Sequence, residues 1–177
     1  AMSQLGNVKA MSNIGNIQVT DTSQHIATGW DSLSSMSSDI LGAIVSTNPT
    51  TPVAITMAQW SNSATALADL QLGTPGQKLA LLDVLPSQAT AASNYANVLT
   101  VSVKGTSAEV AAEFTSLNAL GVKLDEIEVT DDLTLMLTQA QIDGGQDTSV
   151  TNGNVTTVTP GTLSKLLGGG YNYQLIA

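Results

Sequence analysis

The sequence of 177 residues contains no cysteine and no arginine, and only 3% of its residues are aromatic. The lack of cysteine excludes disulfides, thiolate metal sites and thiol nucleophiles, and it is compatible with an oxidising exterior. Positive charge is scarce, with five lysines against fourteen acidic residues and a net charge of −9. Arginine provides the bidentate grip on phosphates and base edges, so we expect no nucleic-acid partner.

Long apolar runs are missing as well. The longest, residues 79–85, is interrupted by Asp83 and is far shorter than the roughly 18 residues that cross a bilayer. Hydrophobic residues still make up 42% of the chain and charged residues only 11%, which is enough apolar material to bury a core. We therefore predict a soluble, folded chain without a membrane span.

The sequence repeats itself. Residues 22–33 align with residues 106–117 at an offset of 84 positions, and residues 55–59 align with 137–141 once two residues are removed from the first copy. A fainter match sets 84–86 on 158–160. We predict a first repeat unit over 1–84, a second over 85–157 and the truncated start of a third over 158–177, joined in one continuous folded domain.

Periodicity assigns the elements of each unit. Apolar residues alternate with polar ones at Ile17 and Val19, which is typical of a half-buried strand. The apolar residues that follow this strand have helical spacing. In the second copy, Thr106 and Glu109 have the pattern of a capping box at the start of the helix, and Gly121 is expected to end it. Further predicted strands cover 43–46, 53–56, 79–85, 99–103, 124–130 and 133–137, and predicted helices cover 57–70, 86–95 and 140–143.

The resulting order β-α-β-β-α-β-α predicts an α/β fold with largely parallel strands, arranged as a solenoid or as one mixed sheet flanked by helices. Antiparallel pairing is expected where two strands adjoin through a short turn. Asn152-Gly153 indicates a hairpin of this kind.

These repeated motifs resemble a known family. Residues 17–22 followed by an Ala/Ser-rich helix, and residues 127–135 followed by Thr138-Gln139-Ala140-Gln141, are similar to repeats of very long bacterial RTX-type surface proteins. The resemblance implies type I secretion and a role in adhesion, surface-layer formation or cell association. Residues 144–147 lack the spacing of the calcium-binding RTX nonapeptide, so no β-roll is expected here.

Candidate catalytic groups are few. His25 is the single histidine and aligns with Glu109 in an exposed first helical turn, which favours a solvated surface residue over a catalytic base. Trp30 aligns with Phe114 and Trp60 with Ile142. A position that accepts an aromatic or an aliphatic side chain requires volume, so both tryptophans are predicted to fill the core. We expect no catalytic residue and no enzyme activity.

Candidate binding groups lie near the C-terminus. Residues 109–147 hold nine of the fourteen carboxylates, and Asp131 with Asp132 could bind Ca²⁺, although a solubilising acidic face is the plainer interpretation. Tyr171 and Tyr173 are the tyrosines expected to be exposed for ligand binding. Two interpretations follow: a non-enzymatic extracellular module that contacts neighbouring repeats or cell-surface components, or a calcium- or glycan-binding module. Calcium is the one possible cofactor.

Overall fold

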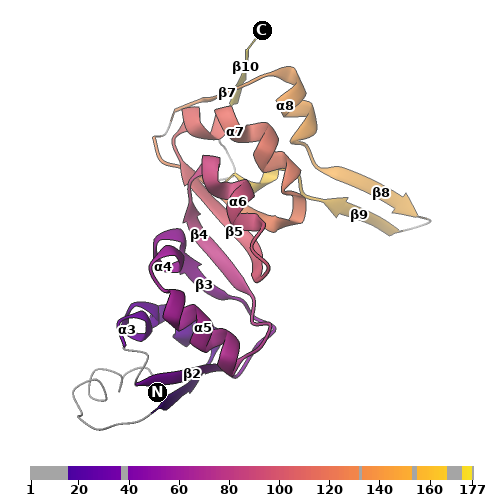
Figure 1. Ribbon diagram of the computed structural model, residues 1–177. Coiled ribbons are helices and arrows are strands. Elements are labelled where there is room, and N and C mark those ends of the chain that lie inside the picture. The colour runs from indigo at the N-terminus through magenta and orange to yellow at the C-terminus, as the bar shows by residue number, and fades with distance from the viewer. Residues whose placement is uncertain (1–15, 37–39, 132, 153–154, 167–172, 177) are drawn as a thin grey trace. The chain divides into compact units, whose positions relative to one another are not determined.

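The computed structural model describes residues 16–36, 40–131, 133–152, 155–166 and 173–176 (Figure 1). As predicted, the protein is α/β, with a mostly parallel central sheet flanked by helices. The chain divides into two compact units. The first contains the described residues up to Leu81 together with Asn97–Leu99, and the second contains Leu82–Ala96 and the described residues from Thr100 onward.

The first unit runs from the indigo strands into the purple helices of Figure 1. Its elements are β1 (Ile17–Asp21), α2 (Ser23–Thr28), α3 (Trp30–Ser34), β2 (Leu41–Ser46), β3 (Val53–Thr56), α4 (Met57–Ser61), α5 (Ala64–Gly73) and the first half of β4 (Leu79–Val84).

The second unit takes the rest of β4 and most of β5 (Val98–Gly105). Its other elements are the 3-10 helix η2 (Pro86–Gln88), α6 (Ala89–Ser93), α7 (Ser107–Ala119), η3 (Gly121–Lys123), β6 (Leu124–Val129), β7 (Leu135–Leu137), α8 (Gln139–Gly144), β8 (Thr148–Asn152), β9 (Val155–Thr159), η4 (Leu163–Lys165) and β10 (Tyr173–Leu175). Within the described ranges, no helix is both long and apolar enough to span a bilayer.

Parallel pairs connected through a helix occur in both units. β1 pairs with β2 through a register that ends at Asp21 and Ser46, and β5 pairs with β6 through one that ends at Gly105 and Val129. In the second unit, β10 pairs in parallel with β7. Strands β3, β4, β5 and β6 are consecutive in one four-stranded sheet.

The expectation of antiparallel pairing between adjoining strands is wrong for β2 and β3 and for β6 and β7. Each member of these pairs lies in a different sheet from its neighbour along the chain. The loop after β2 explains the first case, because the carbonyls of Asn48 and Thr51 accept hydrogen bonds from Ser23 at the start of α2. The expectation is confirmed for β8 and β9, which form an antiparallel hairpin, although residues 153 and 154 of its turn lie outside the described residues.

The predicted helix caps form. The Thr106 hydroxyl accepts a hydrogen bond from the Glu109 amide at 3.3 Å, and the Glu109 carboxylate accepts one from the Thr106 amide at 2.8 Å. Thr22 caps α2 in the same way by accepting from the His25 amide. Gly121, with φ +54°, follows the end of α7 in the left-handed conformation expected of a helix stop.

Two predicted helices are interrupted. Gly29 separates α2 from α3, whereas α7 continues through the matching position, which holds Glu113. Glycine is a poor helix former, which accounts for the break. The helix expected over 57–70 divides at Asn62 and Ser63 into α4 and α5.

The core of the first unit includes one face of α2 and α3, and the core of the second includes one face of α7. Six side chains on these faces are fully buried: Ile26, Trp30 and Leu33 in the first unit, and Val110, Phe114 and Leu117 in the second. The predicted equivalence of Trp30 and Phe114 is therefore confirmed. Trp60 is only half-buried, unlike its counterpart Ile142, so the prediction that it fills the core is wrong.

The two large aromatic residues are packed differently at one point. The indole N–H of Trp30 donates to the Ser63 hydroxyl at 3.0 Å, seven residues after the cap residue Thr56. Seven residues after the cap residue Thr138 stands Gly145, which lies against the Phe114 ring. A phenyl ring has no N–H to satisfy, so a side chain at position 145 has no hydrogen bond to make and no space to occupy.

We predict that Gly145→Ala destabilises the protein by about 1–3 kcal/mol, the usual cost of overpacking. The added Cβ would lie 2.7 Å from Cε1 of Phe114, whereas φ at this residue is −88° and imposes no backbone strain. Gly144→Ala is the matched control, because its nearest neighbour would be Nδ2 of Asn118 at 3.4 Å. Urea unfolding measures both, and equal losses of stability would contradict the packing explanation.

Candidate functional site

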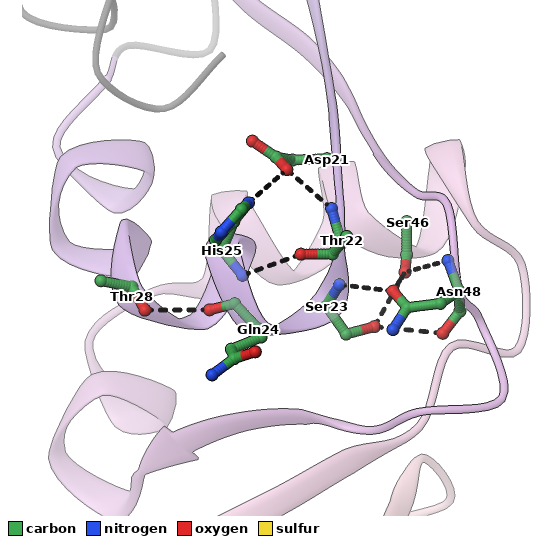
Figure 2. A network of polar contacts seen from close by, with 8 residues as sticks. All are labelled: Asp21, Thr22, Ser23, Gln24, His25, Thr28, Ser46 and Asn48. Carbon is green, nitrogen blue, oxygen red and sulfur yellow. Dashed lines mark hydrogen bonds and ion pairs between the residues drawn. The ribbon is translucent and has the colours of Figure 1, made fainter.

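A polar cluster lies where the parallel strands β1 and β2 end and α2 begins (Figure 2). The carboxyl ends of parallel strands meet at one edge of a sheet, which is where α/β proteins commonly place functional groups. Here β1 ends at Asp21 and β2 at Ser46, and Thr22 leads from the first strand into the helix.

Ser23 is the centre of this cluster and is fully buried. Its amide donates to Oδ1 of Asn48 at 2.7 Å, and its hydroxyl lies 2.8 Å from the Ser46 hydroxyl (Figure 2). The hydroxyl also donates to the Thr51 carbonyl at 2.8 Å. The hydroxyl is therefore held by the loop after β2. This arrangement attaches the start of α2 to the end of the neighbouring strand and leaves Ser23 poorly placed to act as a nucleophile.

His25 lies on the surface, as predicted, but it has a partner that the sequence analysis did not foresee. Its Nδ1 is 2.8 Å from Oδ1 of Asp21, an acceptor that also binds the Thr22 amide at 2.9 Å (Figure 2). The His25 ring, followed by the Thr22 amide, lowers the pKa of Asp21 below its ordinary value. The spacing of four residues was the available signal, because such residues are neighbours at a helix start.

An aspartate and a histidine alone do not make a hydrolytic site. A catalytic triad needs a hydroxyl or thiol on the second ring nitrogen, but Ser23 is engaged elsewhere and the Thr28 hydroxyl donates to the Gln24 carbonyl. Glu109 stands at the position of His25 in the second unit. The shared feature of the two positions is thus their place in the first helical turn.

The second unit repeats the central contact with different chemistry. The Ser107 amide donates to Oδ1 of Asp131 and its hydroxyl donates to Oδ2, both at 3.0 Å. The Leu133 amide also donates to Asp131, at 3.5 Å. Asp131 follows β6 by two residues, as Asn48 follows β2, so an aspartate and an asparagine perform the same structural task.

Hydrogen bonding sets the protonation of the carboxylates at this helix start. Desolvation raises the pKa of Asp131, but the hydrogen bonds from the amide and hydroxyl of Ser107, together with those from the Leu133 and Asp131 amides, outweigh it, and the pKa lies below the ordinary value of 3.8. The Thr106 amide and hydroxyl likewise lower the pKa of Glu109. Both residues are held in the ionised form by groups that cap the helix.

Several described acidic residues of the second unit each have a separate polar partner. Glu128 pairs with Lys104 at 2.9 Å, Asp143 accepts from the Gln139 amide group and Asp147 from the Gly161 amide. In the part of the chain that the structure describes, no group of three or more His, Asp or Glu could hold a metal ion. Asp132 lies outside the described residues, so calcium binding by Asp131 and Asp132 stays a prediction.

The remaining candidates are at the surface or outside the described residues. Tyr173 on β10 is exposed, as expected, whereas Tyr171 is not described. A groove of about 600 Å³ lies along the ends of α6 and α7. Lys123 is the single ionisable side chain in its lining, and its ammonium donates to the Ser93 carbonyl at 2.6 Å. The groove therefore has no acid–base pair for catalysis.

No family model, curated protein or solved structure matches the chain. The comparison that the chain itself offers is between its two units. Their polar contacts coincide at the caps Thr22 and Thr106, at the helix residues Ser23 and Ser107, and at the loop residues Asn48 and Asp131.

We predict that Asp131→Asn keeps most of the stability at neutral pH, because an asparagine performs this task in the first unit. Asp131→Ala should lower the melting temperature further, since the Ser107 amide and hydroxyl lose their acceptor. The pKa of Asp131 in the folded protein is lowered, so its contribution is complete above 3.8 and is lost as the pH falls through the folded-state pKa. The stability gap between the native chain and Asp131→Asn should therefore shrink below pH 3.8. Thermal melts across this range measure the gap, and a constant gap would contradict the assignment.

Proposed function

We propose that this chain is a non-enzymatic structural or adhesive repeat module of a bacterial surface protein and acts outside the cell. The observation that carries the proposal is the kind of residue that the two units share. These residues cap helices, fill the core or join a helix to a strand, as Thr22 and Thr106, Trp30 and Phe114, and Ser23 and Ser107 do.

Groups that could bind or react differ between the units. His25 is matched by Glu109, and the half-buried Trp60 by the buried Ile142. A catalytic site requires several polar groups that converge on one place and remain available to a substrate. The polar groups of the helix-start cluster are instead used by the backbone, which supports a structural role.

The arrangement of the chain is part of the same proposal. We take the two units as tandem copies of one β-α-β-β-α-β-α unit, stacked as a solenoid or joined in a single sheet. Their shared element order, from a strand through a capped helix to a second strand and on to a second capped helix, supports this duplication. The resemblance to RTX-type surface repeats, the acidic charge and the lack of cysteine favour export by a type I system.

The location is tested on intact cells of the bacterium that makes the protein. We expect an antibody against this chain to label unpermeabilised cells, and brief protease treatment of intact cells to remove the signal. An antibody against a cytoplasmic enzyme is the control and should label only permeabilised cells. A signal that needs permeabilisation would refute the surface role.

The calcium- or glycan-binding module is the second candidate, supported by the nine carboxylates of residues 109–147 and by the exposed Tyr173. A ligand of the folded state raises the melting temperature by mass action. Because Asp131 is already bound by Ser107, we expect no rise in melting temperature in millimolar Ca²⁺ compared with EDTA. A calcium-dependent rise that Asp131→Asn abolishes would favour the binding module instead.

A further inference from the structure

The two end strands of the described chain each have one edge without a strand partner. β10 pairs with β7 in a two-stranded sheet, and β1 pairs with β2 in another, so among the described residues the second edge of each is unpaired. Unpaired strand edges expose backbone amides and carbonyls, and they are the usual sites where a further strand is added.

We infer from its pairing that β10 occupies, beside β7, the place that β4 occupies beside β3, rather than that of the opening strand of a third unit. The amide of Val53 in β3 donates to the Lys78 carbonyl immediately before β4, and β7, the counterpart of β3, pairs with β10 from Tyr173 onward. The strands β3 and β7 are matched because each leads directly into a capping box, at Thr56 and Thr138. β4, however, has a second neighbour, β5.

β4, which has this second neighbour, is also more buried than β10. The Leu79 amide donates to the Asn97 carbonyl at 2.8 Å, a contact inside the first unit, and Leu79 and Leu81 are only 2% and 0% exposed. Their counterparts Tyr173 and Leu175 on β10 are 44% and 52% exposed. β10 therefore has the apolar side chains of a covered strand without the cover.

β1 is less buried than the strand to which it corresponds. It corresponds to β5, and Gln18 is exposed whereas its counterpart Ser102 is 5% exposed. Ile17 is half-buried whereas Val101 is fully buried. Among the described residues, β10 is therefore a strand of the β4 kind without a β5-like neighbour, and β1 is a strand of the β5 kind without a β4-like neighbour.

The backbone of both edges is oriented for pairing. Ile176 donates its amide to the Leu137 carbonyl on β7, so the amides of Leu175 and Tyr173 point away from β7. On β1, the Ile17 amide donates to the Ile40 carbonyl towards β2, so the Gln18 and Thr20 amides point away from β2.

We propose that the outer edge of β10 binds strand β1 of a second copy of this chain, in parallel, as β5 lies beside β4. This interaction deepens the proposed structural function and rests on it, because it identifies the neighbouring unit as the partner. The contact joins two molecules head to tail, because it uses a different surface on each. Contacts of this kind produce chains of molecules unless they close into a ring.

Disulfide capture tests the proposal directly, since the native chain has no cysteine to interfere. Separately purified Leu175→Cys is mixed with Asn16→Cys, Gln18→Cys or Thr20→Cys in a glutathione redox buffer. We expect a cross-linked heterodimer with at least one of the three β1 variants, formed faster than either homodimer. Leu72→Cys is the matched control, because Leu72 on α5 is 70% exposed and distant in sequence from both strands.

Blocking variants show whether strand pairing is responsible. Tyr173→Pro removes an outward amide at the first residue of β10, where proline is tolerated, and it should abolish the cross-link while the melting temperature stays unchanged. Thr20→Pro provides an independent block on β1 if the first variant does not fold. Cross-linking that equals the Leu72→Cys control, or that survives both proline variants, would overturn the proposal.

The outcome is separable from that of the proposed function. If no cross-link forms but the antibody labels intact cells, the β10–β1 contact is refuted and the surface role stands. If the cross-link forms but the antibody labels only permeabilised cells, the contact stands and the surface role is refuted.

Discussion

The attachment of α2 to the end of β2 in the first unit, and of α7 to the end of β6 in the second, is the contact on which each unit depends. In both units a serine at the first helical position donates its amide to an Asn or Asp side chain two residues past the neighbouring strand. This contact fixes where the helix starts relative to a parallel strand pair. With their starts fixed, α2 packs against β3 and α7 packs against β7, and Trp30 at the start of α3 and Phe114 in α7 are buried in the core.

The exchange of Asn48 for Asp131 separates geometry from charge. Both side chains accept the serine amide with an oxygen, at 2.7 and 3.0 Å, although only one of them is ionised at neutral pH. The required property is therefore an acceptor at that point, and the negative charge in the second unit adds stability without being needed for the geometry. The same holds for Glu109, whose carboxylate accepts from Thr106 as the neutral Gln59 accepts from Thr56. Part of the acidic character of residues 109–147 thus comes from side chains that cap helices.

Local contacts were predictable from the sequence and long-range ones were not. The capping box at Thr106, the helix stop at Gly121 and the burial of Trp30 depend on neighbours a few residues away or on the repeat alignment. The attachment of Ser23 joins residues 25 positions apart, and no short pattern announces it. The predicted pairing of β2 with β3 is wrong for the same reason, because the loop that would form a hairpin is the loop that binds Ser23.

Two like units in succession produce complementary ends. If the last strand of one unit lies beside the first strand of the next, β1 and β10 are the two strands whose matching neighbours are missing among the described residues. The burial values show this asymmetry: Leu79 and Leu81 are covered, and Tyr173 and Leu175 are not. An exposed apolar strand edge is a risk of uncontrolled aggregation unless a specific strand covers it. The strand best matched to cover β10 is one built like β5, and β1 is the other strand of this kind among the described residues.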